Sequence, residues 1–165
     1  MPEPSVRTDS QTGSSGGSVT DEIRELLFDE NVRRGGKFIP GDFDAYVEKI
    51  HRHAEFFRHY RNGKCDAFIA FYCNDPDAKR AFITLVLTAP SARGSKVGAG
   101  LVAAAVATAQ ARGFSSVELE VDVENAPAVA LYKKSGFDVL RETAGRYVMK
   151  RSLDSSANDD GPLRR

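Results

Sequence analysis

The sequence predicts an α/β (α+β) domain: a mixed central β-sheet of about six or seven strands flanked by four helices. Aromatic-rich runs at Glu55–Arg61 and Cys65–Tyr72 lie on either side of Asn62-Gly63, a strong two-residue hairpin signal. The β-branched, mostly apolar run Ala81–Thr88 is typical of a central strand. Helical and strand patterns alternate after it. A hairpin followed by β-α-β-α units implies a mixed sheet with helices on both faces.

Composition supports one folded domain and gives no reason to expect nucleic acid or a membrane as partner. The chain has 165 residues, and 23 Lys and Arg balance 23 Asp and Glu. This balance removes bulk charge as an argument for binding nucleic acid or an anionic membrane, so we expect neither as a partner. The sequence shows no secretory signal and no bilayer-length apolar run. Cys65 and Cys73 are expected to be reduced thiols in a cytoplasmic protein.

The folded domain is expected to span residues 20–153. Residues 1–19 are rich in Ser, Gly, Thr and Gln without an apolar rhythm, so we expect a disordered N-terminal tail. Ser5–Thr8 is the one weak strand candidate within it. Residues 154–165 have a similar composition and are expected to form a disordered C-terminal tail.

Two helices are predicted before the hairpin. The first spans Asp21–Arg33, because Thr20 can cap its start and apolar residues recur at helical spacing. Gly35-Gly36 ends it. The second spans Asp42 to about His51 and carries its apolar side chains on one face.

Helices and strands alternate after Pro90, which ends the central strand. Gly98–Arg112 is alanine-rich and predicts a helix closed by Gly113. Ser116–Val121 alternates apolar and acidic residues, as a half-buried strand does. The remaining predicted elements are the helix Asn125–Ser135 and the strands Phe137–Arg141 and Arg146–Arg151.

The segment from Pro90 to Gly100 has the composition of an anion-binding loop. Its small residues let ligand atoms approach backbone N–H groups, and the following helix adds unpaired N–H donors and a positive dipole end. Arg93 and Lys96 add positive charge, which suits a pyrophosphate. A plain strand-to-helix connection, with Gly98 and Gly100 present for close packing, explains the loop equally well.

Two nucleotide-binding motifs match the loop only in part. Gly98–Ala103 fits the dinucleotide fingerprint, and Glu118 or Glu120 lies about twenty residues on, where a ribose-binding acid is found. However, this fingerprint does not follow the strand directly, and the remaining chain is too short for a doubly wound sheet. Gly94-Ser95-Lys96 lacks the upstream Gly and the following Ser or Thr of a phosphate-binding P-loop.

A second motif favours a different family. Asn125–Phe137, NAPAVALYKKSGF, follows the strand Ser116–Val121. Together with the loop Arg93–Gly100, it resembles the GCN5-related N-acetyltransferase (GNAT) superfamily, over about Phe82 to Leu140. The two segments are similar to the family's R/Q-x-x-G-x-G/A and N-x-x-A-x-x-L-Y-x-x-x-G-F motifs. The resemblance implies the GNAT fold and acetyl-CoA as co-substrate, without a metal.

The resemblance also implies roles for individual residues. Tyr132 would lie near the thioester sulfur as general acid, and Glu120 matches the position of a catalytic base in some members. Asn125 would contact the pantetheine side of the cofactor or its ordered water. The backbone of Val86, Leu87 and Thr88 would pair with the pantetheine arm, and the pyrophosphate would be held by Arg93, Gly94, Ser95, Lys96, Val97, Gly98 and Ala99.

This sequence departs from the family pattern at two places. Lys96 stands where the motif has its first glycine, and a lysine is strained if that position needs a positive φ. Its side chain could instead reach a phosphate. The family also opens with a strand before the first helix, for which Ser5–Thr8 is the only candidate.

The residues can perform the chemistry that acetyl transfer to an amine needs. Tyr132, with an ordinary pKa of about 10, can protonate the leaving thiolate, and Glu120 can accept a proton from the amine. A splayed central strand could offer a backbone N–H to the oxyanion. Structural explanations remain: Asn125 as a helix N-cap, Tyr132 as a core aromatic, and Glu118, Glu120 and Asp122 as one solvated acidic face.

The sequence leaves the acceptor open. His51, His53 and His59 lack the companions of a metal site, and we expect surface or substrate-pocket histidines. The basic run His51–Arg61 and the likeness of Asn74–Val86 to members encoded with surface-polysaccharide genes slightly favour an amino sugar. We predict an acetyl-CoA-dependent N-acetyltransferase acting on a primary amine of a small molecule or peptide, as a monomer or homodimer. The alternative is a catalytically weak acyl-CoA-binding module that serves as a sensor or scaffold.

Overall fold

The computed structural model describes residues 5–9 and 17–153, which form one seven-stranded sheet with helices on both faces. The strand order is β1-β2-β3-β4-β5-β7-β6, and only β4 and β5 run parallel. The expected mixed sheet and four helices are confirmed. The elements in chain order are β1 (Ser5–Asp9), α1 (Gly17–Arg33), α2 (Phe43–His53), β2 (Glu55–Arg61), β3 (Lys64–Tyr72), β4 (Arg80–Thr88), a 3₁₀ turn η1 (Pro90–Ala92), α3 (Val97–Ala111), β5 (Ser116–Asp122), α4 (Ala126–Lys134), β6 (Asp138–Thr143) and β7 (Arg146–Ser152).

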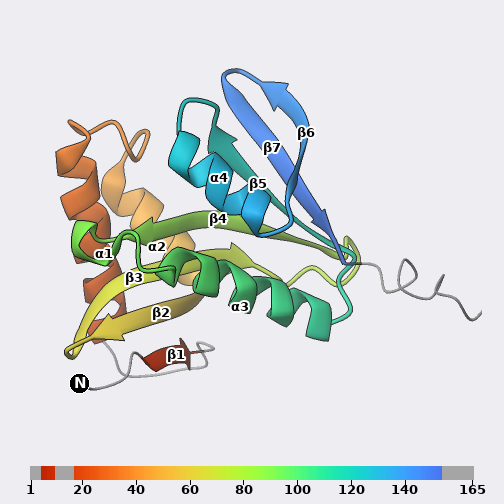
Figure 1. The fold of residues 1–165 in the computed structure, drawn as a ribbon. Coiled ribbons are helices and arrows are strands. Elements are labelled where there is room, and N and C mark those ends of the chain that lie inside the picture. The colour runs from red at the N-terminus through yellow and green to blue at the C-terminus, as the bar shows by residue number, and fades with distance from the viewer. Residues whose placement is uncertain (1–4, 10–16, 154–165) are drawn as a thin grey trace, which may run out of the picture.

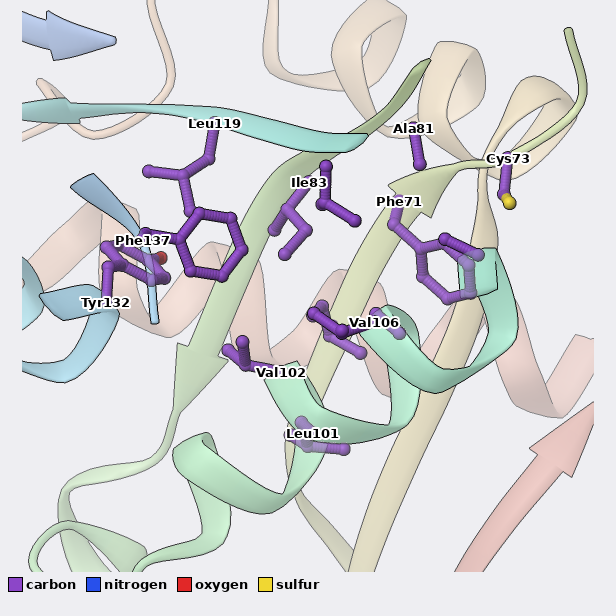
Figure 2. Packing of buried hydrophobic residues seen from close by; sticks show 14 of the residues in the cluster. Phe71, Cys73, Ala81, Ile83, Leu101, Val102, Val106, Leu119, Tyr132 and Phe137 are labelled. Atoms are coloured by element: carbon purple, nitrogen blue, oxygen red, sulfur yellow. The ribbon is translucent and has the colours of Figure 1, made fainter. Parts of the chain in front are cut away.

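Two apolar clusters hold the helices to the sheet. On one face, α3 and α4 pack on the central strands through a cluster that includes Leu101, Val102, Leu119 and Phe137. Figure 2 shows part of this cluster. On the other face, α1 and α2 pack on β2, β3 and β4 through a second cluster that includes Leu27 and other aliphatic and aromatic side chains. Figure 1 shows α3 crossing the sheet on the side opposite α1 and α2.

The N-terminal segment differs from the expectation of a disordered tail over residues 1–19. Residues 5–9 form β1, which pairs antiparallel with β2 from Ser5 opposite Tyr60 to Asp9 opposite Phe56. An edge strand is stabilised by backbone hydrogen bonds to its neighbour, so it needs no apolar rhythm of its own. Helix α1 begins at Gly17, which places Thr20 inside the helix rather than at its cap. The rest of the two expected tails lies outside the described residues.

The hairpin predicted at Asn62-Gly63 is confirmed. Both residues have positive φ, 51° and 76°, and they join β2 and β3. A two-residue turn of this kind matches the right-handed twist of the strands it connects. The topology of the sheet excludes the dinucleotide-binding alternative. That alternative needs a doubly wound parallel sheet, whereas only one pair of the described strands is parallel here.

Two further sequence expectations can be compared with the fold. Cys65 and Cys73 are free and buried, and burial raises the pKa of the Cys65 thiol to about 11. Within residues 5–9 and 17–153, no helix combines the length and the apolar character that crossing a membrane requires.

Candidate active site

The site is built around a gap between two central strands. β4 and β5 pair only from Arg80–Ile83 against Ser116–Leu119, although β4 continues to Thr88 and β5 to Asp122. Figure 1 shows the two strands diverging beyond the paired part. The edge of β4 after Ile83 therefore presents backbone N–H and C=O groups to the gap rather than to a strand. An extended ligand can hydrogen-bond to such an edge as an added strand would.

A β-bulge explains where the strands separate. The register of β4 against β3 shifts between Ile83 and Leu85, so Thr84 is the extra residue. A bulge bends its strand and increases the local twist. The side chain of Thr84 forms a hydrogen bond with Tyr46 of α2, which fixes this bend against the helix layer. Burial raises the pKa of Tyr46, although this hydrogen bond opposes the shift.

Helix α3 begins beside this gap with its first N–H groups available. Its N-cap residue, Lys96, has φ 63° and ψ 13° and makes no side-chain cap hydrogen bond. The N–H of Gly100 donates to the carbonyl of Lys96, 3.1 Å away, so the N–H groups of Val97–Ala99 have no partner within the helix. Gly94, with φ 80°, forms the preceding turn. The loop thus ends at a helix start with unpaired N–H groups, and Lys96 does adopt the positive φ. Binding of a pyrophosphate there stays a prediction.

The two loop glycines have different surroundings. A Cβ atom on Gly98 would lie 3.4 Å from Leu131 Cδ2 and 3.9 Å from Thr88 Oγ1. Gly98 therefore lies where α3, α4 and the end of β4 meet. A Cβ atom on Gly100 would find nothing within 4 Å. Close packing accounts for Gly98 but not for Gly100.

The side chain of Arg93 contacts α1 and the end of β4. Its Nη2 donates to Glu30 Oε2 at 3.2 Å, and its Nε donates to the carbonyl of Thr88 at 3.4 Å. The backbone of Arg93 opens the loop as expected. Its guanidinium group binds Glu30 of α1.

Glu30 is the centre of a cationic cluster that the sequence did not reveal. The side chain is 2% exposed, and it also accepts hydrogen bonds from Arg33 and Arg34. Burial by itself raises the pKa of Glu30, but the hydrogen bonds and charges of Arg33, Arg34 and Arg93 outweigh burial, so its pKa is lowered. Its position on the apolar side of α1 was visible in the sequence. Its partner Arg93 was not, because their contact depends on the fold.

Tyr132 lies on α4 within the apolar cluster. Its ring is edge-on to Phe137, with the centroids 6.1 Å apart, and Figure 2 shows the two side chains together. Burial raises the pKa of Tyr132 to about 12. The preceding residue, Leu131, faces Gly98 of α3. Tyr132 is thus a core aromatic, as the structural explanation held, on the helix that meets the loop and the end of β4.

Asn125 is the N-cap of α4. Its Oδ1 accepts a hydrogen bond from the N–H of Ala128 at 3.4 Å, and Pro127 lies in the first turn. The capping role is confirmed, and a ligand contact by Asn125 stays a prediction.

The three acidic residues of β5 do not form one uniform solvated face. Glu118 is buried and pairs with Arg80 at 2.9 Å. Glu120 is about half exposed, and its Oε2 lies 3.8 Å from Arg146 Nε, beyond hydrogen-bond distance. Asp122 accepts the N–H of Glu124. Glu120 and Asp122 are therefore the exposed carboxylates of this strand.

His53 is exposed on α2, as expected of a surface histidine, whereas His59 is buried. Because it is buried, with its Nδ1 2.6 Å from Asp66 Oδ1, His59 is not a surface histidine. His51 and His53 lie in the last turn of α2. No three His, Cys, Asp or Glu side chains in the described part of the chain are grouped to hold a metal ion. The basic run His51–Arg61 is partly internal, which weakens its use as an argument for an anionic acceptor.

Comparison with known proteins agrees with this geometry. The sequence model of the family described as Acetyltransferase (GNAT) family matches residues 20–137. The chain is 38% identical over 80 residues to a mycothiol acetyltransferase of Brachybacterium faecium, covering 48% of this chain and 22% of that protein. It is 40% identical over 81 residues to an uncharacterised N-acetyltransferase of Methanocaldococcus jannaschii, covering 47% of this chain and 36% of that protein. The chain thus spans between a fifth and two fifths of the length of these relatives.

The fold itself recurs in solved structures. A crystal structure of the PaiA N-acetyltransferase of Thermoplasma acidophilum in complex with coenzyme A superposes with a TM-score of 0.71. The match covers 92% of this chain and 99% of that chain at 14% sequence identity. At this identity the likeness concerns the fold alone.

Proposed function

The chain belongs to the GNAT acetyltransferase family, and from that premise we propose that it transfers an acetyl group from acetyl-CoA to a primary amine. The observation that carries the proposal is the continuity of the unpaired β4 edge with the uncapped start of α3. The strand edge offers alternating donors and acceptors to an amide-containing arm such as pantetheine. The helix start offers N–H donors and a positive dipole end to the pyrophosphate of coenzyme A.

Each residue proposed for the donor site has a place in this arrangement. Val86, Leu87 and Thr88 lie on β4 beyond its pairing with β5, so their backbone can meet the pantetheine arm. The loop from Arg93 to Ala99 would wrap the pyrophosphate mainly through backbone N–H groups. Asn125 would add a contact from the start of α4.

The proposed reaction is direct transfer. The amine nitrogen forms a bond to the acetyl carbon while the bond from that carbon to sulfur breaks. Glu120 takes the proton that the amine loses, directly or through water, and Tyr132 gives its phenolic proton to the departing thiolate. A free N–H of β4 in the gap would stabilise the oxyanion.

The environments of these two residues support the assignment. Burial raises the pKa of Tyr132 to about 12, so the phenol holds a proton at neutral pH, although burial also makes it a weaker acid than the thiol that it would protonate. Glu120 is half exposed on the strand that borders the gap, where a cationic amine can approach it. Among the described residues, its ionic partner is Arg146, whose Nε lies 3.8 Å away, beyond hydrogen-bond distance.

The acceptor is proposed as a primary amine of a small molecule, with an amino sugar as first choice, or of a peptide. A cytoplasmic location and a monomeric or homodimeric state stay predictions. The alternative function is an acyl-CoA-binding module without turnover. The strained Lys96 in a glycine position keeps this alternative open.

A thermal-shift titration with acetyl-CoA, CoA, NAD and ATP tests the donor. A ligand at a hundred times its dissociation constant stabilises the native state by about 2.7 kcal/mol. We expect the unfolding midpoint to rise with acetyl-CoA and CoA but not with NAD. Release of free thiol in the presence of a panel of amino sugars, amino acids, polyamines and peptides then separates enzyme from binding module. No shift with either CoA species would contradict the proposal.

A further inference from the structure

We propose that Arg33, Arg34 and Arg93, gathered on Glu30, bind the 3′-phosphate of coenzyme A. This inference rests on the proposed function, because it assigns the end of the same ligand. It concerns a cluster that lies beside the phosphate loop and that the acetyl-transfer chemistry does not use.

The cluster is a compact cationic surface with a buried anionic centre. Arg33 donates to Glu30 Oε2 from Nη2 at 2.7 Å, Arg34 donates to Oε1 from Nε at 2.7 Å, and Arg93 reaches both oxygens at 3.2 and 3.4 Å. Three guanidinium groups therefore share one carboxylate. Because Glu30 is 2% exposed, the carboxylate itself is hidden from a ligand.

The charges of this cluster do not balance. Three positive charges face one negative charge, which leaves two positive charges uncompensated within the cluster. In the described part of the chain, all three arginines form their ion pairs with Glu30. A phosphate monoester carries close to two negative charges at neutral pH. The charge of a phosphate monoester therefore matches the two uncompensated positive charges of the cluster.

The arginines are also accessible. Their side chains are 41%, 47% and 52% exposed for Arg33, Arg34 and Arg93. Each guanidinium group has five N–H donors and uses only a few of them on Glu30 and neighbouring carbonyls. The remaining donors can form the paired hydrogen bonds that phosphate oxygens accept from arginine.

The position of the cluster fits one particular phosphate. Arg93 links the cluster to the start of the loop, since its Nε also binds the carbonyl of Thr88 at the end of β4. The free N–H groups of Val97–Ala99 at the start of α3 suit the pyrophosphate. In coenzyme A the 3′-phosphate lies one ribose away from the pyrophosphate. The 3′-phosphate of coenzyme A would therefore occupy a second anion site next to the loop.

Calorimetric titrations with CoA and 3′-dephospho-CoA test the proposal, because the two ligands differ only in this phosphate. The unchanged protein should bind CoA about tenfold more tightly than 3′-dephospho-CoA. In Arg33→Ala and Arg34→Ala, the ratio of the two dissociation constants should fall towards one. The affinity of these variants for 3′-dephospho-CoA should stay unchanged. Arg33→Lys should keep part of the preference, because it keeps the charge. Arg52→Ala is the matched control, since Arg52 forms an exposed helical ion pair with Glu48.

Three outcomes overturn the inference. Equal affinity of the unchanged protein for the two ligands excludes a phosphate site. An equal loss of affinity for both ligands in the variants means that the arginines only position the loop. If neither ligand binds the unchanged protein, the proposed function fails together with this inference, which separates that result from the other two.

Discussion

Arg93 Nη2 lies 3.2 Å from Glu30 Oε2, although 63 residues separate them in the chain. The contact ties the loop at the end of β4 to α1. The same guanidinium group binds the carbonyl of Thr88, so the strand, the loop and the helix are fixed at one point. The contact therefore anchors the start of the loop that would receive the pyrophosphate to α1.

Replacing Glu30 by Gln should destabilise the fold at neutral pH. The change removes the charge on which three arginines converge. The cost should be about 2 kcal/mol, since hydrogen bonds to charged groups each contribute about 1.5–3 kcal/mol and the half-exposed arginines can turn to water. Urea unfolding at pH 7 measures it. Glu48→Gln, which breaks an exposed ion pair with Arg52, should change stability by less than about 1 kcal/mol.

In acid, the unchanged protein and Glu30→Gln should become equally stable. The folded-state pKa of Glu30 is below the ordinary value of 4.5, so its contribution to stability is complete above that value. It is lost as the pH falls through the lowered pKa. Below about pH 4.5, the stability difference between the unchanged protein and Glu30→Gln should therefore shrink. A constant difference down to pH 3 would show that the charge of Glu30 does not contribute.

Tyr132→Phe should separate catalysis from binding. The phenol is buried, and no hydrogen bond of its hydroxyl is recorded among the described residues, so its loss should cost little stability. If Tyr132 is the acid, kcat should fall by about a hundredfold or more while the dissociation constant of CoA stays the same.

The pH dependence of the rate and the control variant Tyr147→Phe complete the test of Tyr132. With its pKa near 12, Tyr132 should produce no loss of rate up to pH 10. Tyr147→Phe, a partly buried tyrosine packed on the same cluster, should leave kcat unchanged. An unaltered kcat in Tyr132→Phe would mean that another group protonates the thiolate.

Glu120→Gln should remove the rise of kcat/KM with pH that a carboxylate base produces. The rate at the optimum should fall by about a hundredfold. Glu124→Gln is the control, because Glu124 is an exposed acid just beyond the same strand. If the two variants have the same pH profile as the unchanged protein, the base lies elsewhere.

The parts of the fold that depend on neighbouring residues could be predicted from the sequence. Asn62-Gly63 defined a hairpin because both residues tolerate positive φ, and Asn125 defined a helix start because its side chain caps locally. The helix α3 followed from its alanine content. Its loop was predicted to bind an anion from its glycines and the helix start, and this stays a prediction.

The parts that depend on distant residues could not be predicted in this way. Strand β1 exists because β2 offers it an edge, which its own composition does not show. The bulge at Thr84 is a mismatch of register with β3, so it needs both strands. His59 was placed at the surface or in a pocket because nothing in its surroundings in the sequence revealed Asp66 as a buried partner.

Lys96 offers a test of backbone strain in the loop. Its φ of 63° is left-handed, which costs a residue with a side chain about 1–2 kcal/mol. Lys96→Gly and Lys96→Ala both lose the charge, but only glycine relieves the strain. Urea unfolding should show the glycine variant to be more stable than the alanine variant by about 1 kcal/mol. Equal stability would mean that the loop adapts without cost.

CoA affinity of the same two variants addresses the role of the lysine charge. If the ammonium group reaches a phosphate, both variants should bind CoA about tenfold more weakly than the unchanged protein. If only loop geometry matters, the glycine variant should bind more tightly than the alanine variant and at least as tightly as the unchanged protein. Calorimetry of the three proteins distinguishes these results.

Gly100→Ala should stabilise the protein and weaken its binding of CoA. A Cβ atom at Gly100 meets nothing within 4 Å, and alanine is favoured over glycine inside a helix by about 0.5–1 kcal/mol. Packing therefore gives no reason for a glycine there. If the reason is the approach of a phosphate to the helix start, the added methyl group should lower CoA affinity although the fold gains stability. Gly98→Ala is the comparison, because its Cβ would lie 3.4 Å from Leu131 Cδ2, at the edge of ordinary van der Waals contact, so it should gain less stability than Gly100→Ala. A Gly100→Ala protein that gains stability and keeps its full affinity for CoA would place the pyrophosphate away from the first turn of α3.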